Sequence, residues 1–498
     1  MKRTPYYLIY LILFSSILFL TACKKDDPEP EPEVIPEADQ VNKFIWDGLK
    51  TYYFWTASVP NLNNSEFDKK DNLNKFLNNY TDPEELFESL LYERGTVDKW
   101  SFIVDDSQKI DDWISGISES MGYDFRLSYV EEGSNNLVGY VRYVLKDSPA
   151  DKAGVKRGDL FLRVNGTQLT VDNYFDLLFT DKTYSIDMAS VSNDIISLNG
   201  KTITMTAIDI HENPILLDTV YQVDGINVGY LMYNGFTSED EVIKVSYDEQ
   251  LNNVFGGFKT KGIQKLIVDL RYNGGGSVQT ATYLASMIYS TDKTKIYFKR
   301  QYNELLEREL TKEYGKGWNI NYFADKLMKT DITNEAAINS LGLTDLYVIT
   351  SEETASASEL LINGLTPYIS VKVIGKNTAG KNVGSITVRD WDKDGKVNPN
   401  HKWAMQPIIL KIANSNDFYD YVNGLEPDIE AFERVSQMRP LGDIDEELLK
   451  IAIDDIKGVK SAIIQPIETF KPFTVSKLQS RFASEMYLND DKLTNLFR

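Results

Sequence analysis

Hydrophobic positions follow a helical spacing early in the chain and a strand-like spacing after it. Apolar residues between 38 and 115 recur at i, i+3, i+4 and i+8, as at Val41, Phe44, Ile45 and Leu49. From 116 to 212 they come in short runs broken by Gly and Asp, such as Tyr123–Tyr129 and Val138–Val144. We therefore expect a helical domain over 38–115 and a β-rich domain over 116–212.

The rest of the chain alternates strands with helices. Lys265–Leu270 has the composition of a buried strand and Ser277–Tyr289 that of a helix, and this order repeats further along. The alternation predicts an α/β core over 222–440, so the whole chain is expected to be a multidomain α+β protein. The extension over 441–498 begins with an acidic helix, and weak helix is predicted near 476–487.

The first residues carry a targeting pattern. Lys2 and Arg3 precede an apolar run over 6–22 that is short for a bilayer span, which predicts a cleaved signal peptide over 1–22. Leu20-Thr21-Ala22-Cys23 resembles the lipobox of bacterial lipoproteins, and that resemblance implies that Cys23 is lipidated. The following acidic, Pro-rich stretch over 23–37 is expected to be a tether. We expect a lipid anchor in the bacterial cell envelope, on the periplasmic side of the outer membrane or at the cell surface.

The net charge and the scarcity of Cys and His exclude several classes of partner and site. The 498 residues include 53 Lys and Arg against 74 Asp and Glu, a net charge of −21. Because such an acidic surface repels phosphate backbones, nucleic acid is not an expected partner. One Cys and two His argue against disulfide frameworks and His-rich or thiolate metal sites. We expect no metal and no cofactor, and a hydrolase of this composition needs a base other than histidine.

A motif in the β-rich stretch indicates a peptide-binding domain. Ser148 and Pro149 open a short helix that ends at Gly154, and a strand follows with an Asn165-Gly166 turn after it. This order resembles a PDZ domain. The resemblance implies a carboxylate-binding loop at Gly122, Tyr123 and Asp124, which holds the end of a peptide added to a sheet edge. A PDZ fold that serves only as a spacer or regulatory clamp remains the alternative.

Two strand-to-helix junctions in the core are rich in small residues. The first, Asp269–Gly276, ends in three glycines, and the second, Thr354–Leu361, contains Ser356 and Ser358. Backbone N–H groups at such junctions can receive a developing negative charge. Taken alone, the glycines could form a tight turn and the serines could be helix caps.

Together these junctions resemble those of the carboxyl-terminal processing, or tail-specific, serine proteases. The resemblance extends to the motifs Asp98–Ile103 and Leu425–Ile429. It implies a ClpP/crotonase-like core, Ser356 as nucleophile and Lys381, 25 positions later, as base. The oxyanion is then expected on the N–H groups of Ala357 and of Gly275 or Gly276.

The residues around Lys381 suit a base. A lysine accepts the serine proton only when it is neutral, so burial must lower its pKa, and the residues next to Lys381 in the sequence are uncharged. Many family members have a glutamine four positions after the lysine, whereas this chain has Ser385, which we expect to orient the amine in its place. Ser358 is the alternative nucleophile.

These expectations amount to a serine endopeptidase that acts on proteins or peptides. A non-catalytic envelope lipoprotein that binds peptide or glycan is the alternative. Asp390–Gly395 matches the first half of a calcium loop, but the twelfth position is His401, so an Asp-Gly hairpin is the simpler reading. His211 and His401 are expected to be structural or surface residues.

Overall fold

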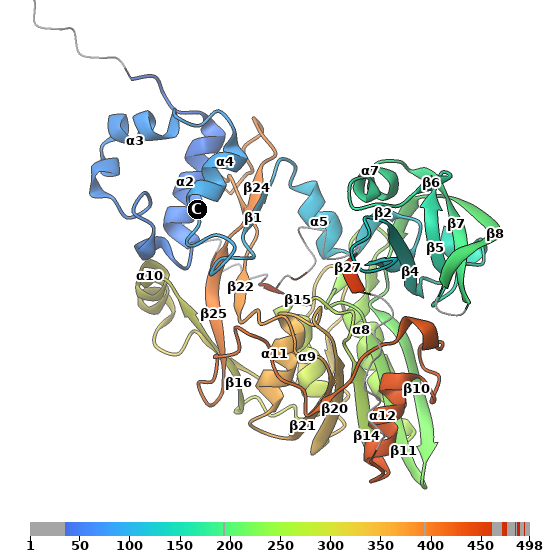
Figure 1. Cartoon of the computed structure of the whole chain (residues 1–498). Coiled ribbons are helices and arrows are strands. Elements are labelled where there is room, and N and C mark those ends of the chain that lie inside the picture. Colours follow the sequence, from blue (N-terminus) through green and yellow to red (C-terminus); the bar gives the residue numbers. More distant parts are fainter. Residues whose placement is uncertain are drawn as a thin grey trace, which may run out of the picture.

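The computed structural model describes residues 35–192, 195–392, 395–460, 471–475, 484, 486–488 and 493. Figure 1 shows a helical unit and a β-rich unit, both packed against a larger α/β core. The predicted multidomain α+β fold is confirmed. The predicted signal peptide, Cys23 and the tether as far as residue 34 lie outside the described residues. Within the described residues, no helix has the length and apolar character needed to cross a bilayer.

The helical unit forms where the apolar spacing predicts it. Its elements are α2 (Gln40–Tyr52), η1 (Thr56–Ser58), η2 (Ser65–Asp68), α3 (Lys70–Leu77), α4 (Pro83–Ser89) and α5 (Gln108–Ile114). Helix α2 begins after Asp39, whose side chain accepts a hydrogen bond from the backbone N–H of Val41 at 2.8 Å. Strand β1 (Phe102–Val104) pairs with β24 (Ala404–Gln406) of the core. This pairing fixes the neighbouring Trp100 near the core.

The β-rich unit is built on a sheet with the strand order β27-β3-β4-β5-β7-β8, with β6 beside β5. The strands are β3 (Tyr123–Tyr129), β4 (Leu137–Val144), β5 (Leu160–Val164), β6 (Thr167–Gln168), β7 (Thr183–Ser192), β8 (Ile195–Thr206) and β27 (Lys471–Val475). Two short helices, α6 (Pro149–Lys152) and α7 (Tyr174–Phe179), and the ribbon of β2 (Ile117–Ser120) with β9 (Ile208–His211) complete it. Ser148 caps α6, and Asn165 and Gly166 turn with positive φ, as predicted. Strand β27 comes from far along the chain.

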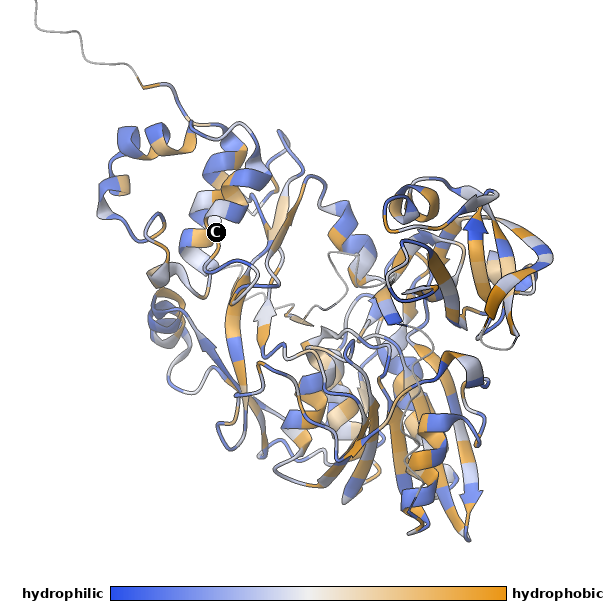
Figure 2. Cartoon of the chain, viewed as in Figure 1, coloured by the Kyte–Doolittle hydropathy of each residue, from blue (hydrophilic) through white to orange (hydrophobic). Residues whose placement is uncertain are grey.

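The main core sheet has the order β10-β11-β14-β20-β21-β26 and is parallel from β11 onward. Its strands are β10 (Ile215–Val223), β11 (Ile226–Tyr233), β14 (Lys265–Asp269), β20 (Asp345–Thr350), β21 (Ser370–Gly375) and β26 (Ile429–Glu430). Leu266 and Val268 pack with helices α8 (Tyr247–Thr260), α9 (Val278–Ile288) and α11 (Ala357–Leu365), whereas Ile267 packs with α12 (Glu447–Ile456). Both faces are therefore covered, and Figure 2 shows these strands as mostly apolar.

A second core sheet has the order β15-β28-β22-β25-β16-β17. Its strands are β15 (Gly276–Ser277), β28 (Met486–Tyr487), β22 (Val383–Ser385), β25 (Ile408–Asn414), β16 (Ile296–Tyr302) and β17 (Ile320–Tyr322). The remaining elements are α10 (Glu304–Tyr314), η3 (Val435–Gln437), β23 (Val388–Arg389), β12 (Glu239–Asp240), β13 (Val245–Ser246), β18 (Lys326–Leu327) and β19 (Ala336–Ala337).

The end of the chain differs from its prediction. The acidic helix is present as α12, but the expected weak helix near 476–487 is wrong at Met486–Tyr487, which form strand β28. This two-residue strand lies between β15 and β22, and pairing with these neighbours outweighs local propensity. Residues 476–483 lie outside the described residues.

Candidate active site

The two small-residue junctions lie together at one edge of the main sheet. The glycine-rich junction follows β14 and the serine junction follows β20, and these parallel strands are neighbours. Their carboxyl ends therefore meet at the same place. The backbone N–H of Ala355 donates to the carbonyl of Asn273 at 3.2 Å, which joins the two junctions directly.

Ser356 occupies an unusual backbone position at the start of α11. Its φ is +65° and its ψ is −113°, a region that non-glycine residues rarely adopt. The side chain is fully buried, and Oγ has no hydrogen-bond partner within the described part of the chain. The serine is thus held on a sharp strand-to-helix turn with its hydroxyl uncommitted.

Glu359 brings Ser356 and Lys381 together. Its Oε2 accepts the backbone N–H of Ser356 at 2.7 Å and that of Lys381 at 2.8 Å. Its Oε1 accepts from Gly380 N at 2.7 Å and from Thr378 Oγ at 2.5 Å. Burial raises the pKa of the Glu359 carboxyl, although these hydrogen bonds oppose the shift. Sequence reasoning missed this role, because it depends on the 378–381 loop folding back onto α11.

Lys381 is fully buried two residues before the start of β22. Its Nζ donates to the carbonyl oxygen of Ser484 at 2.6 Å and lies 5.1 Å from the centre of the Trp100 ring. Since Ser356 Oγ has no hydrogen-bond partner in the described chain, the two predicted dyad atoms are not hydrogen-bonded to each other here. Trp100 belongs to the Asp98–Ile103 motif, so the sequence pointed to this segment, but the contact of Trp100 with Lys381 was not predicted.

Ser385 is the last residue of β22, four positions after Lys381, and has a glutamine beside it. Gln406 of β24 donates through Nε2 to Ser385 Oγ at 3.1 Å, and Ser385 Oγ donates to the carbonyl of Met486 at 3.0 Å. A glutamine thus reaches this position from a different strand, which no local motif could reveal.

Ser358, the alternative nucleophile, has its hydroxyl engaged. Ser358 Oγ donates to the carbonyl of Asn273 at 3.1 Å, so this hydroxyl joins the two junctions.

The residues predicted to bind the oxyanion lie at the two junctions. Gly275 and Gly276 have φ values of +114° and +132°, and a Cβ on Gly276 would lie 2.6 Å from the carbonyl oxygen of Phe236. Glycine is therefore required at position 276. The N–H of Gly275 donates to Asn273 Oδ1 at 2.9 Å, Gly276 pairs with Met486 of β28, and Ala357 is the first residue of α11.

A cavity of about 620 Å³ connects these glycines with the β-rich unit. Gly122, Tyr123 and Asp124, the predicted carboxylate-binding residues, line it together with Gly275 and Gly276. The N–H of Gly122 donates to Ser120 Oγ, Tyr123 OH is hydrogen-bonded to Tyr184 OH, and the Asp124 carboxylate accepts from Arg142. The loop predicted to bind a carboxylate and the glycine turn thus open onto one space.

The two histidines and the segment that resembles a calcium loop form no second site within the described residues. His211 is hydrogen-bonded to Asp240 and His401 to Asp390, each in its own part of the fold. Trp391 forms an antiparallel bridge with Val397 across the segment that resembles a calcium loop, and residues 393 and 394 of that segment lie outside the described residues. Over the described residues, no group of three or more His, Cys, Asp or Glu side chains is arranged to hold a metal ion.

Models of protein families match three stretches of the chain. The peptidase S41 N-terminal domain matches residues 40–102, the PDZ domain matches 140–181, and peptidase family S41 matches 227–431. The matches follow the order of the helical unit, the β-rich unit and the core. This chain belongs to peptidase family S41. It is a serine-type peptidase.

Relatives of the S41 peptidase carry corresponding names. A "Probable CtpA-like serine protease" of Staphylococcus aureus (strain COL) is 23% identical over 404 residues, 76% of this chain and 68% of that protein. The "Carboxy-terminal processing protease CtpA" of Bacillus subtilis (strain 168) is 22% identical over 343 residues, 67% of this chain and 61% of that protein. A Bacteroides fragilis NCTC 9343 crystal structure assigned to the S41 proteases aligns with a TM-score of 0.65 and 23% identity, covering 86% of this chain and 100% of that one. The S41 peptidase shares this fold.

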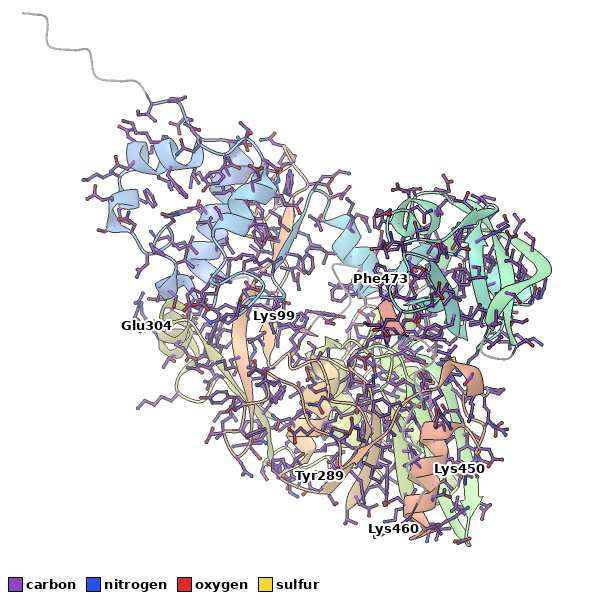
Figure 3. The ribbon with its side chains drawn as sticks, viewed as in Figure 1. Lys99, Tyr289, Glu304, Lys450, Lys460 and Phe473 are labelled. Carbon is purple, nitrogen blue, oxygen red and sulfur yellow. The ribbon has the colours of Figure 1, made fainter. Side chains whose placement is uncertain are left out.

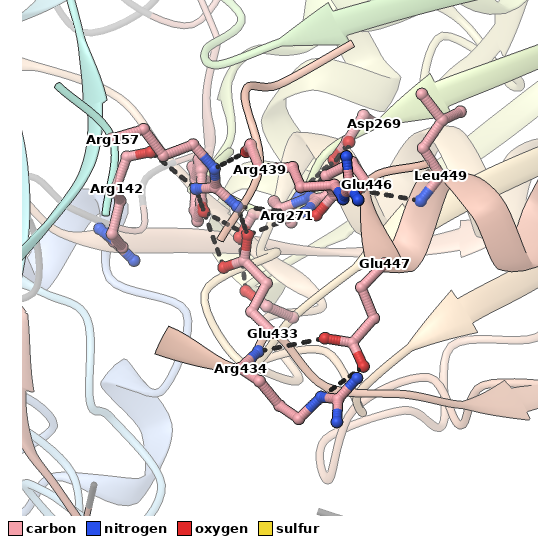
Figure 4. A network of polar contacts seen from close by, with 12 residues as sticks. Arg142, Arg157, Asp269, Arg271, Glu433, Arg434, Arg439, Glu446, Glu447 and Leu449 are labelled. Carbon is pink, nitrogen blue, oxygen red and sulfur yellow. Dashed lines mark hydrogen bonds and ion pairs between the residues drawn. The ribbon is translucent and has the colours of Figure 1, made fainter. Parts of the chain in front are cut away.

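A charged network joins the PDZ domain to the catalytic core of the S41 peptidase (Figure 4). Arg157 of the PDZ domain donates to Glu433 and, at 2.8 Å, to Tyr272 OH in the glycine-rich junction. Arg271 of the same junction donates to Glu433 at 2.8 Å and to Glu446 at 2.7 Å. Burial opposes ionisation of Glu433, but Arg157 and Arg271 hold its pKa well below the usual range.

A second group of ion pairs reaches Glu353, the residue just before the serine junction. Arg142 of β4 donates to Asp124 at 2.6 Å and to Glu353, three residues before Ser356, at 2.5 Å. All three side chains of this Arg142 group are buried. The PDZ domain is thus attached at or beside both junctions that form the candidate active site.

Proposed function

We propose that this S41 peptidase cleaves polypeptides with Ser356 as the nucleophile and Lys381 as the general base. The observation that carries the proposal is the Glu359 carboxylate, one oxygen of which accepts the backbone N–H groups of both residues. Two residues 25 positions apart in sequence are thereby attached to one buried atom. The uncommitted Ser356 hydroxyl and the buried Lys381 amine support these roles.

The reaction follows from these groups. The neutral Lys381 amine accepts the proton of Ser356 Oγ while the oxygen attacks the carbonyl carbon of the peptide bond. The resulting ammonium gives this proton to the departing amine, which leaves an ester on Ser356. Water then attacks the ester carbon while Lys381 accepts a proton from it, the bond from that carbon to Ser356 Oγ breaks, and Lys381 returns the proton to Oγ as the new carboxyl end is released.

The surrounding residues have supporting roles in this proposal. N–H groups of Ala357 and of Gly275 or Gly276 stabilise the oxyanion, and removal of one such donor costs about 3 kcal/mol of barrier stabilisation. Because Gly275 N donates to Asn273, we assign the second donor to Gly276. Ser385, which accepts from Gln406, orients the Lys381 amine.

The PDZ domain suggests which substrates are recognised. We propose that the edge of β3 and the loop at Gly122, Tyr123 and Asp124 receive a C-terminal or unfolded segment of a protein. The name of the Bacillus relative, a carboxy-terminal processing protease, supports this substrate class. The shared cavity supports it too, because a bound end would lie near the glycine turn.

We also propose a lipid anchor at Cys23 in the cell envelope, on the strength of the lipobox-like sequence. Mass spectrometry of the mature protein from the membrane fraction should give an N-terminal peptide that starts at a lipid-modified Cys23. Cys23→Ser should move the protein to the soluble fraction. An unmodified Cys23 in an intact chain would contradict the anchor.

Cleavage of an unfolded, fluorescently labelled protein tests the catalytic proposal. The soluble chain that starts after Lys25 should cut it, and both Ser356→Ala and Lys381→Ala should lower the rate by at least about 1,000-fold. The rate should rise with pH as the lysine loses its proton. Ser358→Ala tests the alternative nucleophile, and Lys376→Ala is a matched lysine control. Loss of activity in Ser358→Ala but not in Ser356→Ala would overturn the assignment.

A further inference from the structure

The chain after α12 returns to both sites that a substrate is proposed to use. Strand β27 adds to the edge of the PDZ sheet, and strand β28 lies between β15 and β22 of the core. Figure 3 shows Lys460 beyond the end of α12 and Phe473 beside the PDZ domain. We call the part of the chain that contains β27 and β28 the C-terminal segment.

At the PDZ domain, the C-terminal segment takes the place of a peptide ligand. Val475 pairs with Arg126 and Lys471 with Tyr129 in an antiparallel register, so β27 runs toward the loop at Gly122. The Phe473 ring packs edge-on against Tyr129 and Tyr174, at centroid distances of 5.4 and 5.1 Å. A PDZ ligand adds to a sheet edge in this way, with its main chain in the ladder.

In the core, β28 of the C-terminal segment lies between β15, which begins at Gly276, and β22, which begins two residues after Lys381. We call this position the catalytic groove. Met486 pairs with Gly276, and Tyr487 pairs with both Ser277 and Ser385. Ser385 Oγ donates to the Met486 carbonyl at 3.0 Å, and Leu488 N donates to the Ser385 carbonyl at 3.1 Å.

Side chains fix this part of the C-terminal segment. Met486 is fully buried and Tyr487 is 3% exposed. The Tyr487 ring packs edge-on against Trp113 at 5.4 Å, at the wall of the cavity that reaches the PDZ loop. An extended polypeptide thus already fills the groove beside the glycine turn.

This occupant also engages the proposed base. Lys381 Nζ donates to the Ser484 carbonyl at 2.6 Å, while Ser356 Oγ has no hydrogen-bond partner in the described chain. Proton transfer from Ser356 to Lys381 requires that these two atoms be hydrogen-bonded, directly or through one water. In this structure the Lys381 amine is instead hydrogen-bonded to the C-terminal segment, and no direct hydrogen bond joins it to Ser356 Oγ.

We propose that the C-terminal segment is an internal inhibitor, which occupies the PDZ edge and the catalytic groove until an extended polypeptide displaces it. This inference rests on the proposed function of Ser356 and Lys381. Because the segment is covalently attached, its effective concentration is high, and a competing polypeptide must overcome two contacts at once. The expected competitor is an unfolded or tail-exposed protein that can reach both places.

A chain that can be cut after folding gives the direct test. A recognition site for a specific protease is inserted between Lys460 and Lys471, so that the full protein folds before the C-terminal segment is severed and removed by gel filtration. Cleavage of the labelled unfolded protein should then speed up at least about tenfold. Adding the synthetic peptide 471–498 should restore the slow rate in a saturable way. An unchanged rate after removal of the segment would overturn the inference.

A point variant tests the groove contact without removing the segment. Tyr487→Ala should raise the basal rate of the full chain about fivefold, while Tyr322→Ala, at an exposed tyrosine of β17, should leave it unchanged. If Tyr487→Ala lowers the melting temperature, the readout becomes the peptide 471–498 carrying the same change, which should inhibit the severed wild-type chain more weakly. Equal inhibition by both peptides would contradict the proposed anchor.

The outcomes separate this inference from the proposed function. If neither form of the chain cleaves, the function fails, but saturable binding of the labelled peptide to severed Ser356→Ala still supports the inference. If both forms cleave at equal rates that depend on Ser356 and the peptide does not bind, the inference fails and the function stands. Trimming of its own C-terminal segment by wild type, absent in Ser356→Ala, would show a substrate instead of an inhibitor.

Discussion

Two glutamates, Glu359 at the dyad and Glu433 at the PDZ interface, are held in opposite ways. Glu359 is fully buried and accepts three backbone N–H groups and one hydroxyl, all from uncharged donors. Glu433 has an 18% exposed side chain and accepts from two arginines and a tyrosine. Burial raises the pKa of Glu359, whereas the arginines hold the pKa of Glu433 low.

This difference indicates two roles: Glu359 positions Ser356 and Lys381, whereas Glu433 docks the PDZ domain on the core. Backbone donors fix Glu359 against the chain at Ser356 and Lys381, so its carboxylate sets the geometry of the two proposed reactive residues. The arginines around Glu433 come from two domains, and their charge holds those domains together. Changes at the two glutamates should therefore affect different measurements.

Loss of the Glu359 carboxylate should have the largest effect. Glu359→Gln places an amide against backbone donors, so Ser356 and Lys381 shift, and a shift of about 1 Å can cost about 100-fold in rate. We expect kcat to fall by at least that factor with little change in KM, as measured by cleavage of the labelled protein. Glu352→Gln, in the turn before α11 and paired at the surface with Arg126, is the control and should change kcat less than about twofold. An equal loss of kcat in the two variants would contradict the positioning role of Glu359.

Loss of the Glu433 carboxylate should mainly lower stability. Glu433→Gln leaves Arg157 and Arg271 with one fewer anionic partner, and breaking such a buried pair costs about 3 kcal/mol. The free energy of unfolding in urea should fall by this amount. Glu447→Gln, whose one arginine partner Arg434 is 19% exposed against 7% for Arg157 and 1% for Arg271, should cost less than about 1 kcal/mol. A smaller loss for Glu433→Gln than for this control would contradict the docking role.

The pH dependence of unfolding should sharpen the contrast with a third buried acid. One oxygen of Asp248 has no hydrogen-bond partner among the described residues, and burial raises its pKa to about 8. Its contribution to the free energy of unfolding is complete below about pH 4 and is lost as the pH rises toward 8, by up to about 1.4 kcal/mol per pH unit. Asp248→Asn should remove this slope.

Glu433 should show the opposite sign. Its lowered pKa gives a stabilising contribution that is present above about pH 4 and is lost as the pH falls. Wild type and Glu433→Gln should therefore converge in stability at acid pH, whereas wild type and Asp248→Asn should diverge as the pH rises. Parallel pH curves for both pairs would show that neither acid is held as described.

Local patterns predicted much of this molecule. The spacing of apolar residues gave α2, β3 and the alternation in the core, because both faces of the main sheet are buried. The resemblance that the two junction motifs carry implied Ser356 and Lys381 as candidates, and the structure attaches both to one carboxylate. The same motifs also placed Gly276, where only glycine fits against Phe236.

Contacts between distant segments could not be predicted in this way. Gln406 reaches Ser385 from another strand, and Arg142 reaches Glu353 from another domain. Strand β28 has only two residues, and its conformation depends on β15 and β22, which flank it. The expected helix there failed because local propensity carries no information about such neighbours.

Covalent labelling of the proposed nucleophile tests the roles of Ser356 and Lys381 directly. A fluorophosphonate probe, which loses fluoride as a serine oxygen bonds to its phosphorus, is added to the wild-type chain, and the modified peptide is mapped by mass spectrometry. We expect an adduct on Ser356, none on Ser356→Ala, and much slower labelling of Lys381→Ala. An adduct on Ser358, or equal labelling of Ser356→Ala, would contradict it.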